Sequence, residues 1–357
     1  MNPAARILIL TPTALPSITG NAMTAERWRR SLEEKDFKIE VQATRGLEVL
    51  MLLKILRSRP AQLIHAHHAF HVGSLLLNPL MEVFGSQIPL VVSPGGTDMN
   101  VDWKDRKKRE IIIRICHRAR SIIVQSEEMH LRLQDLLPEI GDRLRLIRKS
   151  ILHLGQENFD LRGAAGCSAQ NLLFFMPAGI RPVKGNLECL RLLKSVYEQR
   201  PRIRALFAGD PLDSEYSQEF AREAKTLQAF ARWIPPIPPS AILSAYRAAD
   251  IVLNGSYSEG LSNALLEGTA AGRPVLASKI PGNRWAVLGN NDDHPMGFLY
   301  DLDDPEDFLK KALILIDEED IRRKFGEAGI QRAASLPTPG EEADQLARIY
   351  EMALNPA

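Results

Sequence analysis

Two glutamates, Glu259 and Glu267, stand eight positions apart in the segment SYSEGLSNALLEGTAAGRPVLAS, residues 256–278. They suggest either an acid and a base that act together or two separate contacts with one ligand. On one continuous helix an eight-residue step would leave the two side chains about 80° apart. A strand is predicted to end just before this segment, and a helix to begin near Ser262 or Asn263. We therefore expect Glu259 in the loop and Glu267 inside the helix.

The start of this predicted helix is suited to binding an anion. Ser262 is expected to cap the helix, and the free backbone amides at a helix N-terminus attract negative charge. Glu259 and Glu267 would then contact different parts of one ligand, with its anionic group between them. The spacing thus favours two separate contacts over a catalytic acid–base pair.

A second candidate site is the loop AGIRPVKG, residues 178–185, in which Arg181 and Lys184 follow a predicted strand. Two cations beside a glycine suit a diphosphate, because arginine offers a planar fork and lysine a compact point charge. An ordinary solvated basic loop is the alternative. The position at the carboxyl end of a strand favours the diphosphate site.

Two loops in the first half of the chain also carry residues suited to ligand binding. Gly20 and Asn21 precede a predicted helix, and Gly96 and Asp98 lie in SPGGTDMN after a predicted strand. Glycine lets backbone amides approach a ligand closely, and a helix N-terminus adds its dipole. Ordinary turns with capping residues are the alternative for both loops.

The histidine-rich segment HAHHAFHVG, residues 65–73, raises the question of a metal site. Imidazole is the commonest metal ligand, but no carboxylate or cysteine completes a ligand set locally. A strand end also exposes such side chains without any metal. A contact of His67 or His68 with a ligand is the other possibility.

Composition restricts the class of protein. The chain has 357 residues, 45% apolar and 25% charged, with a net charge of +1, which is typical of an ordinary globular protein with two domains. The charge balance argues against a dedicated nucleic-acid binder. The three cysteines lack paired spacings, and no stretch is long enough to span a bilayer, so we expect a cytoplasmic protein.

Several common motifs are missing. Neither GxGxxG nor GxxxxGK[ST] occurs, so a standard dinucleotide fold and a P-loop nucleoside triphosphatase are not supported. GSYSEG has Ser256 where the first glycine of the GxSxG serine hydrolase motif is required. The loops described above therefore remain the candidates for a functional site.

The elements that position these loops alternate between strands and helices. Short β-branched or Leu-rich runs, predicted as buried parallel strands, separate longer amphipathic stretches such as 22–35 and 127–137. The predicted strands are RILILT near residue 6, KIEVQ at 38, QLIHAH at 62, PLVVS at 89, SIIVQS at 121, LRLIRK at 144, LLFFMPA at 172, IRALFAG at 203, DIVLNGS at 250, PVLAS at 274 and GFLYD at 297.

Two doubly wound α/β domains follow from this pattern. The periodicity lapses over residues 155–170, as in an interdomain linker. We predict an N-terminal domain at 1–160, a C-terminal domain at 161–338, and a final helix in 339–357 that packs back on the N-terminal domain. In doubly wound folds ligands bind at the carboxyl ends of the strands, where the candidate loops lie.

With these motifs, the sequence resembles the retaining GT-B glycosyltransferases of the E-x7-E type (glycosyltransferase family 4, glycosyl transferases group 1). It is most similar to the branch of glycosyltransferase-one-domain-containing proteins, and some selenosugar synthases are similar too. The signature is Glu259-GLSNALL-Glu267. The likeness also includes TGN at 19–21, GGTD at 95–98, GIRPVKG at 179–185, AGDP at 208 and KIPGN at 279–283.

The resemblance implies a GT-B fold, two Rossmann-like domains that face a central cleft. It implies transfer of a sugar from a nucleotide-diphosphate sugar, with a UDP-sugar favoured and a GDP-sugar possible, to an acceptor with retained anomeric configuration. The C-terminal domain would bind the donor and the N-terminal domain the acceptor. No metal and no cofactor besides the donor would be required.

The resemblance also implies roles for individual residues. The catalytic residues would be Arg181 and Lys184 at the diphosphate and Glu259 at the donor sugar, while Glu267 would contact the ribose. The predicted substrate-binding residues are Gly20, Asn21, His67, Gly96, Asp98, Gly260, Leu261, Ser262, Asn263 and Glu267.

Two departures from the family pattern leave alternatives open. The family arginine usually stands five positions before the lysine, where this chain has Gly179, and many relatives have histidine in place of Gly95. A nucleotide-sugar epimerase or hydrolase, or a non-catalytic nucleotide-sugar-binding protein, would fit the same motifs. Residues 103–120, basic with an internal apolar run, suggest peripheral membrane contact or a solvated amphipathic helix.

Overall fold

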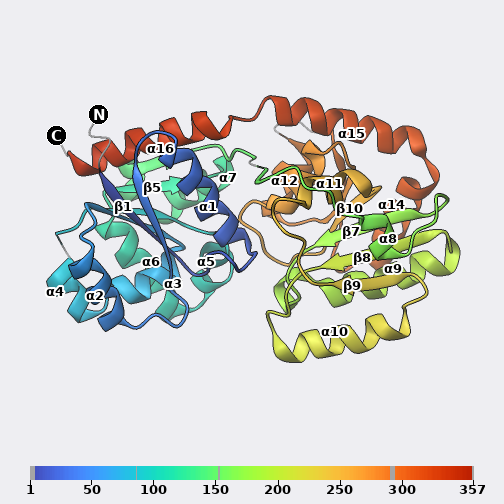
Figure 1. The fold of residues 1–357 in the computed structure, drawn as a ribbon, viewed down its shortest axis with the longest axis horizontal. Helices are drawn as coiled ribbons and strands as arrows, with labels where there is room; N and C mark the ends of the chain where they lie inside the picture. The colour runs from blue at the N-terminus through green and yellow to red at the C-terminus, as the bar shows by residue number, and fades with distance from the viewer. Residues whose placement is uncertain (1–4, 86, 152, 290–293, 356–357) are drawn as a thin grey trace. The chain divides into compact units, whose positions relative to one another are not determined.

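The computed structural model of the chain describes two compact units, which we call unit 1 and unit 2. Unit 1 comprises residues 1–152 with 336–357, and unit 2 comprises residues 153–335. Each is built from strand–helix pairs around its own parallel sheet (Figure 1). The described residues are 5–85, 87–151, 153–289 and 294–355.

Unit 1 has a six-stranded parallel sheet in the order β2-β1-β3-β4-β5-β6. The strands are β1 (Arg6–Thr11), β2 (Lys38–Ala43), β3 (Leu63–His67), β4 (Leu90–Ser93), β5 (Ser121–Val124) and β6 (Leu144–Leu146). The helices are α1 (Gly20–Glu33), α2 (Val49–Ser58), α3 (Ala69–Leu76), α4 (Pro79–Gly85), α5 (Thr97–Asn100), α6 (Arg106–Arg118), α7 (Glu127–Leu136) and α16 (Pro339–Leu354), with 3-10 turns η1 (Asp102–Lys104) and η2 (Pro138–Arg143).

Alternation along the strands gives unit 1 two hydrophobic cores, one on each face of its sheet. Leu8 and Leu10 of β1 pack in the core that α2, α3 and α6 cover, whereas Ile7 and Ile9 pack in the core under α1 and α16. This is the period of two expected of a buried strand, in which successive side chains point to opposite faces.

Unit 2 repeats this architecture with the sheet order β12-β11-β10-β7-β8-β9. The strands are β7 (Leu172–Pro177), β8 (Ile203–Ala208), β9 (Ala231–Ile234), β10 (Ile251–Asn254), β11 (Val275–Ser278) and β12 (Gly297–Tyr300). The helices are α8 (Leu161–Ala165), α9 (Asn186–Gln199), α10 (Ser214–Thr226), α11 (Ile242–Ala248), α12 (Asn263–Ala270), α13 (Pro281–Leu288), α14 (Pro305–Asp317) and α15 (Glu319–Ala334), with a 3-10 turn η3 (Pro182–Lys184).

The sequence pattern missed one strand and treated one packed segment as a linker. The missed strand β9 is a four-residue strand at the edge of the sheet that buries only its first residue fully, and its sequence ARWI is interrupted by a charged residue. The predicted linker contains α8 and packs on unit 2, where the Phe159 amide donates to Ser244 Oγ at 2.8 Å and Arg162 pairs with Asp250 at 2.9 Å. Residues 153–160, which we predicted as the end of the N-terminal domain, belong by their contacts to unit 2.

The last helix, α16, packs on α1 and joins unit 1 through one buried carboxylate. Glu342 accepts from Arg27 Nε at 2.9 Å and from Trp28 Nε1 at 2.8 Å. It also accepts from the Ser150 amide at 3.1 Å and from Gln125 Nε2 at 3.3 Å. One side chain of α16 thereby ties together α1 and the segments that follow β5 and β6.

Residues 103–120 include helix α6, whose apolar side chains are buried or, at Ile111 and Ile113, partly buried. Ile112, Ile115 and Cys116 belong to the core of unit 1. Most of the apolar run of this segment therefore packs in the core, which favours the amphipathic helix over a membrane contact. Within the described residues, no helix combines the length and the apolar character needed to cross a bilayer.

Candidate active site

The two loops with the strongest motifs lie next to each other in unit 2. They follow β7 and β10, which pair directly in the sheet through Ile251 and Phe174. From β7 the chain proceeds to β8 and β9 on one side, and then to β10, β11 and β12 on the other. The loops thus flank the point at which the strand order reverses, where doubly wound folds bind ligands.

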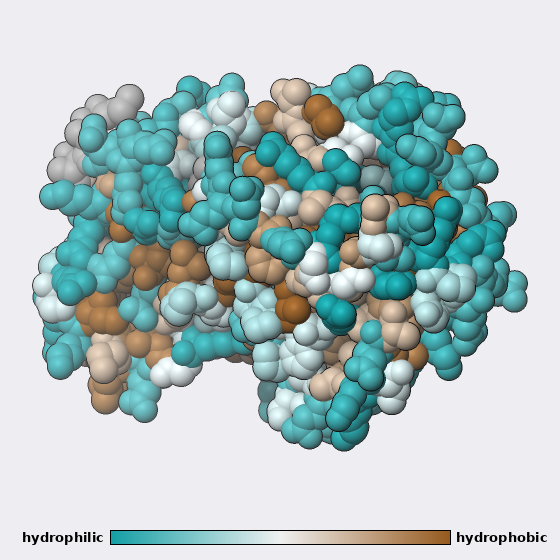
Figure 2. All heavy atoms as spheres, turned by 45° about the vertical axis from the view of Figure 1, so that its right-hand side comes forward, coloured by the Kyte–Doolittle hydropathy of each residue, from teal (hydrophilic) through white to brown (hydrophobic). Residues whose placement is uncertain are grey.

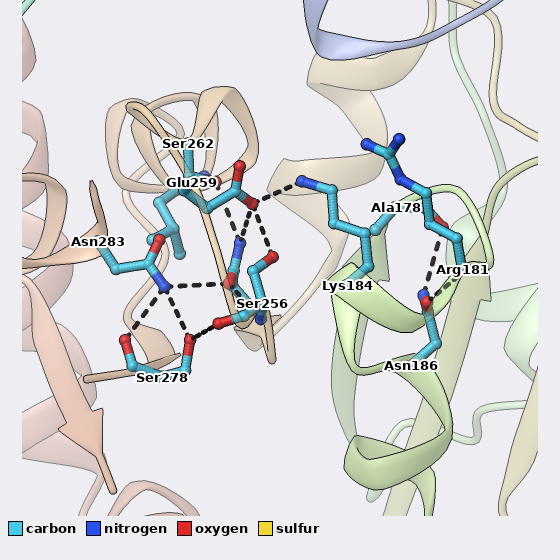
Figure 3. Close-up of polar contacts among 11 residues, drawn as sticks. Ala178, Arg181, Lys184, Asn186, Ser256, Glu259, Ser262, Ser278 and Asn283 are labelled. Carbon is cyan, nitrogen blue, oxygen red and sulfur yellow. Dashed lines mark hydrogen bonds and ion pairs between the residues drawn. The ribbon is translucent and has the colours of Figure 1, made fainter. Parts of the chain in front are cut away.

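A short ion pair joins these two loops. Lys184 Nζ lies 2.6 Å from Glu259 Oε1, and the two side chains are 19% and 12% exposed (Figure 3). Ser256 Oγ also donates to Glu259 Oε1 at 2.7 Å. Burial alone would raise the pKa of Glu259, but the Lys184 ammonium and the hydrogen bonds outweigh it and hold the pKa below its ordinary value. Glu259 is therefore a carboxylate at neutral pH and not a proton donor.

Four buried polar residues, which the sequence analysis did not select, hold the loop that carries Glu259. Asn254 donates to Ser262 Oγ at 3.1 Å and accepts from the Ser256 amide at 3.0 Å. Asn283 donates to Asn254 Oδ1 at 3.1 Å and to Ser278 Oγ at 3.0 Å (Figure 3). The only sequence signal for this network is that Asn254 and Ser278 end neighbouring strands.

Glycine is required where the lysine loop meets the glutamate loop. Gly185 has φ +62°, and a Cβ atom there would lie 2.2 Å from the carbonyl oxygen of Gly255. Only a residue without a side chain permits both the left-handed backbone and this close approach. The backbone contact thereby places Lys184, which ends η3, beside Glu259.

Arg181 precedes Lys184 on the same loop. Its amide donates to Asn186 Oδ1 at 3.2 Å, at the start of α9. In Figure 3 the Arg181 guanidinium and the Lys184 ammonium extend toward the same side of the loop. The structure brings the two predicted cations together.

Helix α12 begins where the sequence predicted, and it separates the two glutamates. Ser262 is the N-cap and its hydroxyl accepts from the Leu265 amide, so Glu259 is in the loop and Glu267 in the second turn. Gly260, Leu261 and Asn263 occupy the boundary between them. The loop-to-helix position of the pair is confirmed.

Glu267 has a buried partner that the sequence analysis missed, Tyr246 of α11. Burial, together with the charge of Glu267 and a hydrogen bond to it, raises the pKa of Tyr246 well above its ordinary value. The phenol therefore stays protonated and donates to the carboxylate. This contact orients Glu267, which remains partly exposed.

In unit 1, Asp98 holds the glycine loop that follows β4. It is fully buried and accepts from the amides of Gly96 at 2.9 Å, Gly95 at 3.0 Å and Ala69 at 2.6 Å. Gly96 has φ +96°, which explains its residue type. Because both carboxylate oxygens are bonded to loop amides, we assign Asp98 to positioning the loop in place of the predicted ligand contact.

His67 lies in the core of unit 1. Its Nδ1 is 2.9 Å from Ser93 Oγ and its ring meets the edge of Trp28. Burial lowers its pKa well below the ordinary value, so the ring is neutral. Burial and these contacts hold the ring in the core, in place of the predicted ligand contact of His67.

The next residue, His68, lies beside the predicted loops. A Cβ atom placed on Gly95 would be 3.2 Å from Cδ2 of His68 and 3.3 Å from Oδ1 of Asn21. His68 also has an unusual φ of +93°. The structure thus brings together the loops after β1, β3 and β4, with Asn21 and His68, and not His67, beside Gly95. Gly20 is the first residue of α1.

One group in unit 1 has the side chains of a metal site. His68, His71 and Asp102 place ligand atoms within 4.8 Å of one another. However, Lys108 Nζ lies 2.7 Å from Asp102 Oδ1 and its ammonium also lies over the Phe70 ring. The carboxylate of this group therefore already has a positive partner, Lys108.

Comparisons with known proteins agree with the fold and match the segment that contains both loops of unit 2. The family model described as "Glycosyl transferases group 1" matches residues 161–332. "Glycosyltransferase 1 domain-containing protein 1" from Xenopus tropicalis is 25% identical over 89% of this chain and 90% of that protein. "D-inositol 3-phosphate glycosyltransferase" from Corynebacterium kroppenstedtii is 32% identical over 48% of this chain and 38% of that protein, so this likeness covers only part of both chains.

Solved structures give the same result over nearly the whole chain. Sucrose-phosphate synthase from Thermosynechococcus elongatus aligns with a TM-score of 0.80 at 16% identity, covering 98% of each chain. Anabaena HepE in complex with UDP-glucose aligns with a TM-score of 0.74 at 17% identity, covering 97% of this chain and 99% of that one. The protein therefore has the two-sheet architecture of the GT-B fold.

The match to residues 161–332 is more specific than the fold, because it covers both loops of the candidate site. This match agrees with the resemblance to the glycosyl transferases group 1 family that the sequence motifs indicated.

Proposed function

We propose that this protein transfers a sugar from a nucleoside diphosphate sugar to an acceptor, with retention of the anomeric configuration and without a metal. The observation that carries the proposal is the Lys184–Glu259 pair, which lies at the reversal point of the sheet beside the N-terminus of α12. A UDP-sugar is the favoured donor, since the HepE structures contain UDP or UDP-glucose, and a GDP-sugar is the alternative.

The proposed reaction breaks the bond between the anomeric carbon and the distal phosphate oxygen. Negative charge then develops on the diphosphate, and Lys184, Arg181 and the amides at the start of α12 are the groups that would stabilise it. The acceptor oxygen forms the new bond on the same face of the sugar, and its proton passes to the departing phosphate. This route needs no carboxylate nucleophile.

Glu259 has a different part in this proposal from that of a catalytic acid. It is ionised and bonded to Lys184, so it contributes an acceptor for sugar hydroxyl groups and a fixed position for the lysine. When a donor diphosphate binds, Lys184 is expected to share its hydrogen bonds between Glu259 and phosphate oxygens. One ion pair would thus connect the sugar and the diphosphate of the donor.

Glu267 is proposed to bind the ribose of the nucleotide. A carboxylate accepts two hydrogen bonds from neighbouring hydroxyl groups, and Tyr246 fixes the Glu267 side chain from the other side. Phosphates at the start of α12 would leave the ribose near the following turn, where Glu267 lies.

The ribose assignment is tested by Glu267→Ala. Loss of hydrogen bonds to a charged group is expected to weaken UDP binding about tenfold or more, as measured by calorimetry. The matched control is Glu215→Ala, which removes an exposed glutamate of α10 and should leave UDP affinity unchanged. Equal affinities of wild type and Glu267→Ala would refute the ribose role.

Metal independence is tested by a chelator. The rate of UDP release from UDP-glucose is expected to be the same with and without EDTA, because Lys184 and Arg181 supply the positive charge that a metal would otherwise provide. Loss of the rate in EDTA, restored by a divalent cation, would show that this part of the proposal is wrong. Product analysis with and without an acceptor separates a transferase from an epimerase or a hydrolase.

A further inference from the structure

Unit 1 carries a hydrophobic surface away from the predicted substrate loops. It consists of side chains of α2 and α4, two helices that pack against each other. Figure 2 shows brown, hydrophobic residues gathered at the lower left, the height at which Figure 1 draws these helices. The exposed side chains, which we call the α2–α4 patch, are Leu50 (66% exposed), Met51 (52%), Leu80 (44%), Val83 (73%) and Phe84 (56%).

Packing of the core does not explain these residues. Helix α2 already buries an apolar stripe, Leu52, Leu53 and Leu56, in the core of unit 1. Leu50 and Met51 are on the exposed part of the same helix. Single exposed apolar residues are normal, but a cluster on two contacting helices is typical of an interaction surface.

Positive charge borders the patch. Residues 49–60 contain Lys54, Arg57 and Arg59 and no acidic residue. The Arg57 guanidinium lies 5.0 Å from the centre of the Phe84 ring, so one cation is directly above the patch. Across the described residues, Lys54 and Arg57 form no ion pair.

The one acidic residue of α4 does not balance these cations. Glu82 pairs with Arg114 of α6 at 2.7 Å. Arg118 of α6 also donates to the carbonyl of Gly85 at 2.8 Å, which holds the end of α4. Helix α6 therefore anchors the patch and adds positive charge at its border, although its own apolar residues are buried.

We propose that the α2–α4 patch binds the surface of an anionic lipid bilayer. The exposed apolar side chains would enter the boundary between headgroups and acyl chains, while Lys54 and Arg57 contact lipid phosphates. Apolar insertion and charge attraction each contribute weakly to membrane affinity, and stable peripheral binding needs both.

The charges favour lipid over a second copy of the chain. In a two-fold interface the same patch would face itself, so Lys54 and Arg57 would meet the same cations, with the exposed Glu48 at the N-cap of α2 as the acid nearest to them along the chain. An anionic membrane supplies the missing negative charge. Both helices belong to unit 1, and the proposal does not depend on the donor chemistry assigned to unit 2.

The test is cosedimentation of the full chain with lipid vesicles. Wild type is expected to bind vesicles of phosphatidylcholine with phosphatidylglycerol, to bind phosphatidylcholine alone much less, and to be released by high salt. The double variant Val83→Glu/Phe84→Glu is expected to lower the apparent vesicle affinity about tenfold or more, because two inserted side chains become anions. The matched control is Leu131→Glu on α7, which changes a residue that is 61% exposed elsewhere in unit 1.

Calorimetric UDP binding and thermal unfolding report whether the variants are folded. Absence of vesicle binding by wild type, or equal loss in the control variant, would overturn the proposal. Concentration-dependent dimers of wild type that the double variant abolishes, without vesicle binding, would assign the patch to a second copy instead. Failure of wild type to bind UDP would contradict the proposed function and leave the vesicle result unaffected.

Discussion

Replacing Lys184 with alanine is expected to lower kcat about 100-fold or more, as expected for removal of one donor aimed at the charge of the transition state. The ammonium lies 2.6 Å from Glu259 and is mostly buried, so water cannot replace it well. The measurement is the rate of UDP release from UDP-glucose with an acceptor that supports turnover by wild type.

The control for Lys184→Ala is Lys194→Ala, an exposed lysine on the next helix, α9, which should leave kcat unchanged. Thermal unfolding should accompany both assays, because the variant leaves Glu259 partly buried without its cation. A folded Lys184→Ala protein with near-normal turnover would exclude the proposed stabilisation of the leaving group.

Replacing Glu342 with glutamine is expected to destabilise unit 1 by about 3–5 kcal/mol, the usual effect of leaving one partner of a buried pair without its counter-charge. Arg27 and Glu342 are both buried, with side chains only 7% and 1% exposed. Chemical denaturation followed by the fluorescence of Trp28, with the remaining tryptophans replaced by phenylalanine, gives the free energy of unfolding.

The matched control is a substitution at Asp344, which lies on the same helix, α16. Asp344 pairs with Lys35, but its side chain is 52% exposed, so Asp344→Asn is expected to change stability by about 1 kcal/mol or less. Equal effects of the two substitutions would show that burial of the Glu342 pair has no special importance.

The same carboxylate predicts a pH dependence. Burial alone would raise the pKa of Glu342, but Arg27 and the hydrogen bonds from Ser150 and Trp28 outweigh it and lower the pKa. A carboxyl with a lowered pKa in the folded state contributes stability that is fully present above its unfolded value, about 4.3, and is lost as pH falls through the folded value. Wild type should therefore lose more stability below about pH 4 than Glu342→Gln does.

The sequence predicted what depends on local pattern. The alternation of apolar strands with amphipathic helices indicated two doubly wound sheets, and Ser262 marked the start of α12 correctly. The motifs also identified Lys184 and Glu259, because they follow strands that pair in the sheet. Whether a residue directly follows a strand can be predicted from the local sequence alone.

What the sequence could not predict depends on contacts between distant segments. Tyr246 and Glu267 are on different helices, and no spacing rule connects them. His67 and His68 are neighbours in sequence, yet the first contacts Ser93 and the second lies beside Gly95, because the strand ends at His67 and the backbone turns at His68, where φ is +93°. The partners of Glu342 are more than 190 positions away along the chain, as for Ser150, which is 192 residues earlier.

The division of the chain has a consequence for the order in which the protein can fold during synthesis. Unit 2 is one continuous segment, residues 153–335, whereas unit 1 is interrupted by it and includes 336–357. The buried cation Arg27 therefore has no counter-charge from Glu342 until Glu342 has left the ribosome. The segment made second can complete its fold first, and the unit made first depends on the last helix to be made.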